Sequence, residues 1–309
     1  MKGLVLFAAA AAFAEPRQRR VEIEYFVEVR GVPADKTADV WLPVPHDDPF
    51  QKISGREVDS HWRYRITKGA EGNTFLHTRA NSDGEIALRF EAVRAERIQP
   101  ARETPANGDA GPGCCLNPDR LVPLDEKIRA QAREVVDARG AKTPVEKARA
   151  IYDHVVGTVK FDKSGKGWGR GDIHYACDAR RGNCTDFHAI FIGYARAVGV
   201  PARFAIGVPL PAKRGKGTIA GYHCWAEFHA PGSGWIPVDA SEAAKDPSRR
   251  EYFFGALDEN RVEFSRGRDI HLSPHQQGDP LNFFVDAYAE LDGRPFPGVK
   301  TSVRFRDLD

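Results

Sequence analysis

Alternating hydrophobic and polar residues mark the first hundred positions of the chain. In VEIEYFVEV every second residue from Val21 to Val29 is apolar, and EIALRFEA repeats the pattern from Ile86 to Ala92. A period of two places such side chains on one face of a strand. We therefore expect residues 15–98 to form a β-rich, sandwich-like N-terminal domain.

Residues 99–118 interrupt this pattern. The segment QPARETPANGDAGPGCCLNP is rich in Pro, Gly and small polar residues, as is typical of a linker or a long surface loop. We place the boundary between two domains here, with residues 119–309 forming the second domain and its C-terminal extension. A chain of 309 residues, 41% of them hydrophobic, is long enough for two domains.

Helical periodicity follows the linker. It predicts one helix across residues 124–138 and a second that begins at the capping box TPVE, residues 143–146, with proline at the first helical position. A third is predicted within RGNCTDFHAIFIGYARAVG, residues 181–199, with Asn183 as its N-cap and Gly199 at its end. Because strand-like segments come next, the predicted fold class is α+β, with helices packed on an antiparallel sheet.

Three residues in chain order have the chemistry of a thiol nucleophile, its base and a carboxylate that orients the base. Cys184 opens the third predicted helix, where unpaired backbone N–H groups favour a thiolate. His223 in GYHCWAEF and Asp239 in GWIPVDASE follow. Their segments read as two adjacent antiparallel strands, an arrangement that suits a hydrogen bond between imidazole and carboxylate.

Four blocks of the sequence resemble the transglutaminase-like superfamily, whose members share a papain-like cysteine core: GNCTDF, GVPARF, YHCWAEF and WIPVDAS. The resemblance extends from about residue 117 to about residue 290. It implies that Cys184 is the nucleophile, His223 the general base and acid, and Asp239 the orienting carboxylate. Each residue alone has an ordinary structural explanation, so the prediction rests on the ordered set. We interpret Asp186 and His188, on the same helix, as structural.

The backbone N–H of Cys184 needs a second donor beside it to hold a tetrahedral oxyanion. The resemblance implies that this donor lies upstream of the nucleophile. Two side chains there carry a suitable N–H or O–H group, Trp168 in SGKGWGRGD and Tyr175 in IHYAC.

The N-terminus has the features of a cleavable secretory signal. Lys2 precedes an apolar run from Leu4 to Phe13, and Ala12-Phe13-Ala14 forms a small-residue cleavage site, so we expect cleavage after Ala14. The chain is therefore expected to be secreted or periplasmic, with no transmembrane segment. In an oxidising compartment the four cysteines other than the nucleophile are expected to form two disulfides, and links from Cys114 and Cys115 to Cys177 and Cys224 are the simpler arrangement. The alternative is that some of these thiols stay reduced and buried.

The predicted reaction is acyl transfer from an amide through a thioester, without a cofactor or a metal. Hydrolysis would make the protein a cysteine peptidase or amidase, and transfer to an amine would make it a transglutaminase. A third alternative is an inactive exported module that binds a peptide or an envelope component, with its cleft blocked by residues 209–220. The expected partner is a peptide or protein, cell-envelope peptides included. A net charge of +2 indicates no nucleic-acid-binding surface.

Overall fold

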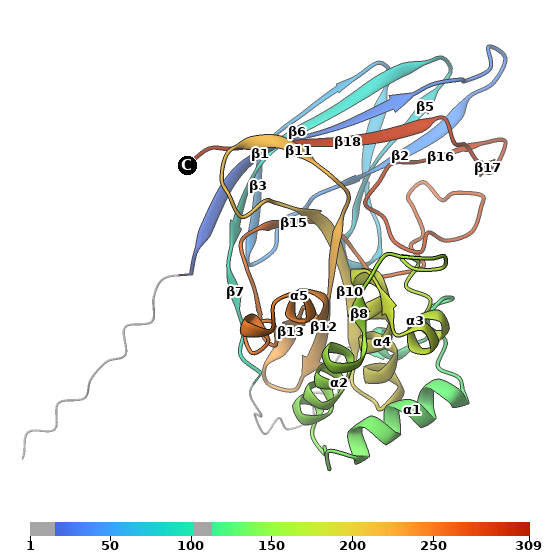
Figure 1. Ribbon diagram of the computed structural model, residues 1–309. Helices are drawn as coiled ribbons and strands as arrows, with labels where there is room; N and C mark the ends of the chain where they lie inside the picture. Colours follow the sequence, from blue (N-terminus) through green and yellow to red (C-terminus); the bar gives the residue numbers. More distant parts are fainter. Residues whose placement is uncertain (1–15, 102–112) are drawn as a thin grey trace, which may run out of the picture.

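The computed structural model describes residues 16–101 and 113–309 and combines sheets with helices (Figure 1). Two five-stranded sheets occupy one end of the molecule, and a four-stranded sheet with five helices occupies the other. The predicted α+β fold class is confirmed. The expected signal peptide and most of the expected linker lie outside the described residues.

The two five-stranded sheets pack against each other. The first has the strand order β11 (Lys216–Ile219), β18 (Val299–Asp307), β1 (Gln18–Val29), β6 (Gly84–Ala95) and β3 (Gln51–Ser60). The second has the order β17 (Arg294–Pro295), β16 (Tyr288–Leu291), β2 (Ala38–Val44), β5 (Thr74–Ala80) and β4 (Tyr64–Lys68). The alternating residues of β1 and β6 are buried in one core with those of β2 and β5, so the sandwich predicted from the alternation is confirmed.

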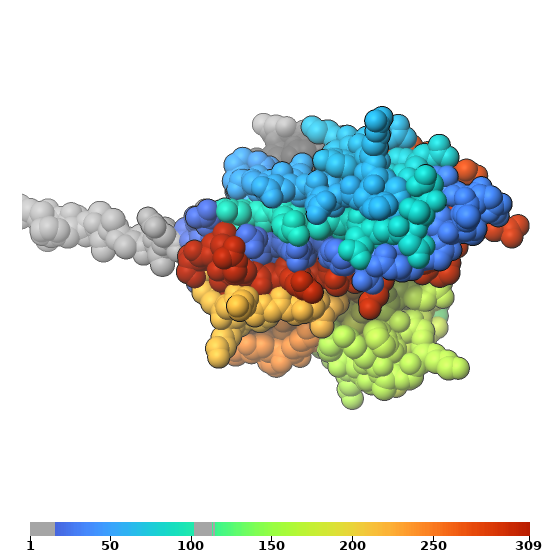
Figure 2. Space-filling model, turned by 90° about the horizontal axis from the view of Figure 1, so that it is seen from above, coloured from blue at the N-terminus to red at the C-terminus, as the bar shows by residue number. Residues whose placement is uncertain are grey.

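Strands from both ends of the chain build these sheets. The C-terminal strand β18 pairs antiparallel with β1 from Val21↔Asp307 to Val29↔Val299, and β16 pairs with β2. Figure 2 shows the red C-terminal strand against the blue N-terminal strands. The sheets of the N-terminal half are therefore completed by residues 216–219 and 288–307, a pairing that the local sequence pattern does not reveal.

The second half is built around one buried helix, α4 (Cys184–Ala197). It packs against the sheet of β13 (Gly234–Val238), β12 (His223–Ala230), β10 (Ala202–Pro209) and β15 (Arg261–Arg266). The other helices surround it: α1 (Glu126–Asp137), α2 (Pro144–Thr158), α3 (Ile173–Ala179) and α5 (Ala240–Lys245). The three helices expected from the sequence are confirmed, including the capping box at Thr143 and Glu146.

Short elements complete the fold. The strand pairs are β7 (Arg97–Ile98) with β14 (Ala256–Leu257), and β8 (Lys160–Phe161) with β9 (Arg181–Gly182). The 3₁₀ turns are η1 (Ala70–Gly72), η2 (Gly113–Leu116) and η3 (Pro247–Arg249). Because β9 leads directly into α4, its pairing with β8 positions the start of the helix that carries Cys184.

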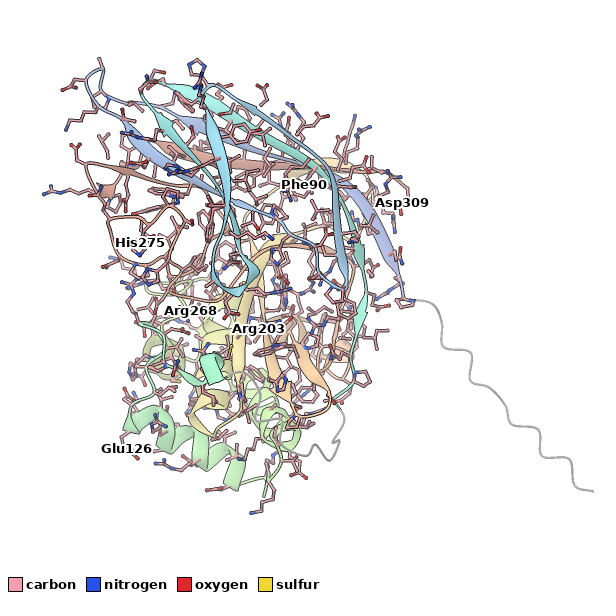
Figure 3. The ribbon with its side chains drawn as sticks, turned by 180° about the vertical axis from the view of Figure 1, so that it is seen from behind. Phe90, Glu126, Arg203, Arg268, His275 and Asp309 are labelled. Atoms are coloured by element: carbon pink, nitrogen blue, oxygen red, sulfur yellow. The ribbon has the colours of Figure 1, made fainter. Side chains whose placement is uncertain are left out.

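Buried charges join the sandwich to the four-stranded sheet. Glu227 on β12 is fully buried and pairs with Arg97 on β7 and with Arg203 on β10. Nearby, Arg266 on β15 lies 3.1 Å from the carboxylate of Asp48 in the N-terminal half. Figure 3 shows Arg203 in this middle layer, between the sandwich and the helices. Such pairs orient the two halves, because a misaligned pair would leave a buried charge without a partner.

Candidate active site

Cys184 is the first residue of α4, and its surroundings hold that helix end in place. Asn183 is the N-cap: its side-chain oxygen accepts a hydrogen bond from the Thr185 N–H at 3.0 Å, while Asp186 accepts one from the Asn183 N–H at 2.9 Å. The Cys184 side chain is only 4% exposed. The first turn of a helix favours an anion, so this position stabilises a thiolate.

The β12–β13 hairpin brings His223 to Asp239. The two strands pair antiparallel, with Ala226 opposite Val238, as the sequence predicted. His223 is the first residue of β12, and Asp239 follows β13 directly as the N-cap of α5. The distance from His223 Nε2 to Asp239 Oδ2 is 2.7 Å, which leaves Nδ1 as the ring nitrogen available to the thiol.

The charges at this site support one another. Hydrogen bonding to Cys224 and to His223 holds the pKa of the Cys184 thiol well below its ordinary value, although burial opposes the charged form. Burial also disfavours the His223 imidazolium, but Asp239 and Cys184 raise the pKa of His223 to about 10. At neutral pH the arrangement therefore favours a thiolate beside an imidazolium.

Asp239 is fully buried and has several partners besides His223. Arg261 Nη1 lies 2.9 Å from Asp239 Oδ2, while Ser241 Oγ and the Glu242 N–H donate to Asp239 Oδ1 at 3.0 and 3.1 Å. Burial alone would raise the pKa of Asp239, but the positive charges of His223 and Arg261 hold it well below its usual range. The carboxylate therefore remains ionised and fixed in orientation.

Sequence reasoning assigned no role to Arg261. It lies in the segment FGALDENRVEF, which contributed to the family resemblance, but nothing local marks it as a partner of Asp239. The antiparallel pairing of β15 with β10 brings it to the site. Its second nitrogen, Nη2, lies 3.1 Å from Asp258 Oδ1, so one buried guanidinium connects two carboxylates.

Asp186 and His188 have structural contacts, in agreement with their interpretation. Asp186 accepts hydrogen bonds from the backbone N–H groups of Gly169 and Gly171, at 2.7 and 3.1 Å, and so anchors the loop that carries Trp168 beside the start of α4. His188 is fully buried, and its Nε2 accepts a hydrogen bond from the Ala240 N–H at 3.2 Å. Both residues position neighbouring backbone.

A cavity of about 530 Å³ opens at Cys184. His223, Arg261 and Trp168 line it together with the cysteine, whereas Tyr175 is not among the lining residues. The full lining is Phe161, Lys163, Trp168, Asn183, Cys184, Pro209, Leu210, Ala212, Ala220, Gly221, Tyr222, His223, Glu242, Lys245, Arg249, Asp258, Asn260 and Arg261. Residues of the 209–220 loop form one wall of this space and do not fill it.

The expected disulfides are not formed. Cys177 and Cys224 are thiols: Cys177 Sγ lies 3.4 Å from the Tyr194 hydroxyl, and Cys224 Sγ lies 3.6 Å from His188 Nδ1. Cys224 is fully buried at the start of β12, where it faces α4 through His188. The number and spacing of the cysteines in the sequence do not reveal such burial.

Within residues 16–101 and 113–309 there is no group of three or more side chains placed to hold a metal ion. In the same described ranges, no helix has the length and apolar character needed to cross a membrane.

A family model described as the transglutaminase-like superfamily matches residues 129–240, the range that contains Cys184, His223 and Asp239. The chain belongs to the transglutaminase-like superfamily. An uncharacterized protein of Haemophilus influenzae is 33% identical over 83% of this chain and 81% of its own length.

Two solved structures are similar to this chain at lower sequence identity. A proposed cysteine protease from Cytophaga hutchinsonii is 17% identical, with a TM-score of 0.62 over 96% of this chain and 92% of that one. The likeness shows that the arrangement of sandwich and helical core recurs across nearly the whole chain. The periplasmic domain of TgpA from Pseudomonas aeruginosa is 15% identical, with a TM-score of 0.39 over 78% of this chain and 98% of that one.

Proposed function

We propose that this protein is an exported cysteine-dependent acyl-transfer enzyme that acts on amide bonds, with Cys184, His223 and Asp239 as its catalytic triad. The observation that carries the proposal is the placement of Cys184 and His223 on the wall of one cavity, with the buried Asp239 hydrogen-bonded to His223 behind it and with complementary charges among the three. Family membership supports the same chemistry.

In the proposed reaction the Cys184 thiolate attacks the carbonyl carbon of an amide. The backbone N–H at the start of α4 stabilises the oxyanion, and the Trp168 indole N–H is our candidate for the second donor because Trp168 lines the cavity. The His223 imidazolium then gives its proton to the departing amine, which leaves a thioester on Cys184. Asp239 holds the imidazole in the orientation required for this transfer.

Water is the acceptor that we favour for the second step. His223, now neutral, takes a proton from water as the oxygen attacks the thioester, and collapse of the intermediate releases a carboxylic acid and restores the Cys184 thiolate beside the His223 imidazolium. An amine in place of water would make the enzyme a transglutaminase. A cavity that is open beside Cys184 favours catalysis over a binding module with a blocked cleft.

The first test is the pH dependence of Cys184 alkylation by iodoacetamide, followed by peptide mass spectrometry. We expect an apparent thiol pKa well below about 8.5 in the native chain and a rise toward that value in His223→Ala. His174→Ala is the matched control, because this histidine is partly exposed and lies outside the cavity. An ordinary apparent pKa for the Cys184 thiol that is the same in the native chain and in His223→Ala would contradict the proposal.

Two further measurements address the acceptor and the compartment. Incubation of the protein with peptide substrates and a fluorescent primary amine separates hydrolysis, which releases free acids, from transfer, which labels the acyl donor. N-terminal sequencing of protein recovered from the secreted or periplasmic fraction should begin at Glu15. Recovery only in the cytoplasm with residues 1–14 intact would contradict export.

A further inference from the structure

The cavity at Cys184 is lined by more positive than negative side chains. Four cations face it, Lys163, Lys245, Arg249 and Arg261, against the carboxylates of Glu242 and Asp258. The chain as a whole carries a net charge of only +2. This local excess is a property of the cleft, and low-dielectric walls strengthen the attraction of such a cleft for an anion.

Both lining carboxylates already have partners. Glu242 Oε1 lies 2.6 Å from Lys245 Nζ. Asp258 is shared by two arginines, with Arg261 Nη2 and Arg249 Nη2 each 3.1 Å from one of its oxygens. Neither acid is available to neutralise a further cation.

Of the four cations that line the cavity, Lys163 is the one that is not paired with Glu242 or Asp258. Asp162, its neighbour in the chain, accepts hydrogen bonds from Ser164 and lies 3.8 Å from Arg181. Within the described part of the chain Lys163 forms no ion pair, and its ammonium group lies 5.7 Å from the ring centre of Phe161 and 5.8 Å from that of Trp168. Two aromatic faces thus hold a solvated positive charge at the cavity wall, beside the loop of the candidate oxyanion donor.

The same aromatic wall holds a second ammonium group. Lys245 Nζ lies 4.0 Å from the ring centre of Phe161, so Phe161 contacts cations from the 160–170 loop and from α5. The side chain of Lys245 is 37% exposed, and that of Arg249 on η3 is exposed to the same extent. Positive charge therefore continues from Lys163 across the cavity wall toward the Asp239 end of the site.

We propose that the substrates of this cleft are acidic peptides, in which a carboxylate lies next to the amide that Cys184 attacks and pairs with the ammonium group of Lys163. This inference rests on the proposed function, because it names the substrate class of that same site. Lys245 and Arg249 contribute to the attractive field, and their own carboxylate partners reduce their share.

The test compares two reagents that differ in charge and alkylate the same thiol. Iodoacetate carries a carboxylate and iodoacetamide does not, so the ratio of their second-order rates at Cys184 reports the field inside the cavity. We expect Lys163→Gln to lower this ratio about two- to fivefold at low salt, as for a unit charge at several ångströms in a hydrated cleft. Added salt should reduce the difference.

Lys166→Gln is the matched control, because this lysine lies three residues away on the same loop and is exposed but does not line the cavity. We expect it to leave the ratio unchanged. The His223 imidazolium also attracts iodoacetate, but it does so equally in all three proteins. A ratio that is the same in Lys163→Gln and the native chain would overturn the substrate class, as would an equal fall in the control.

Protection experiments test the ligand itself. The tripeptides Ac-Ala-Glu-Ala-NH₂ and Ac-Ala-Gln-Ala-NH₂ differ in one carboxylate, and the acidic one should protect Cys184 from iodoacetamide at lower concentration. This preference should be lost in Lys163→Gln. Equal protection by both peptides would overturn the inference while leaving the proposed function intact. If Cys184 instead reacted as an ordinary thiol with iodoacetamide, the proposed function and the inference would both fail.

Discussion

Replacing Arg261 with methionine should destabilise the protein strongly. The Arg261 side chain is 3% exposed and connects Asp239 and Asp258 through contacts of 2.9 and 3.1 Å. Methionine keeps much of the volume but removes the positive charge between two buried carboxylates. Loss of one partner from a buried ion pair costs about 3–5 kcal/mol, because the remaining charge is desolvated. His223 and Arg249 stay beside the two carboxylates, but both carboxylates lose a partner at once, so we expect a loss within this range. At about 2–4 °C per kcal/mol, the melting temperature should fall by on the order of 10 °C.

Arg306→Met provides the matched control. Arg306 Nη2 lies 2.9 Å from Glu22 Oε2, the same length as the contact between Arg261 and Asp239, but the two side chains are 57% and 40% exposed. An exposed pair contributes about 0–1 kcal/mol. Urea denaturation of the native chain and both variants measures the contrast. A loss in Arg261→Met no larger than the loss in the control would refute the reasoning.

A double variant separates charge from packing. In Arg261→Met with Asp258→Leu, one of the two carboxylates that lose Arg261 is gone, and Arg249, whose side chain is 37% exposed, can be hydrated once Asp258 is absent. We expect the double variant to be more stable than Arg261→Met alone. Additive losses would instead show that Arg261 acts through its packing.

Three other predictions follow from the site and the core. Trp168→Phe removes the indole N–H but keeps a ring, and should lower kcat for p-nitrophenyl acetate hydrolysis about 10²-fold, whereas Tyr175→Phe should not. Burial opposes ionisation of Glu227, but its two arginines lower the pKa of this carboxyl to about 2. The ionised carboxylate therefore stabilises the fold above about pH 4.5, and this stabilisation is lost as the pH falls toward 2. In Glu227→Gln the urea midpoint should depend less on pH over this range. Differential alkylation without reductant should find Cys177 and Cys224 as thiols, and a disulfide at either would contradict the structure.

Local patterns predicted the elements of this fold and the chemistry of its candidate site. The helix that starts at Cys184 and the strands that carry His223 and Asp239 were predicted from periodicity, caps and turn residues, which depend on neighbours a few positions away. The order of the three residues indicated their chemistry. Trp168, which lines the cavity, was a candidate because the resemblance directed attention upstream of the cysteine, and its role as an oxyanion donor stays a prediction.

Long-range packing decided the rest. The pairing of β18 with β1 joins residues almost three hundred positions apart, and the contact between Arg261 and Asp239 depends on the register of β15 against β10. The thiol state of Cys224 follows from its burial opposite α4. Hydrophobic alternation and helix-capping residues act on the backbone conformation of their own segment, and the sequence by itself therefore determined these strands and helices. The partners of a buried charge or thiol are set by which segments share the interior, and this only the tertiary structure decided.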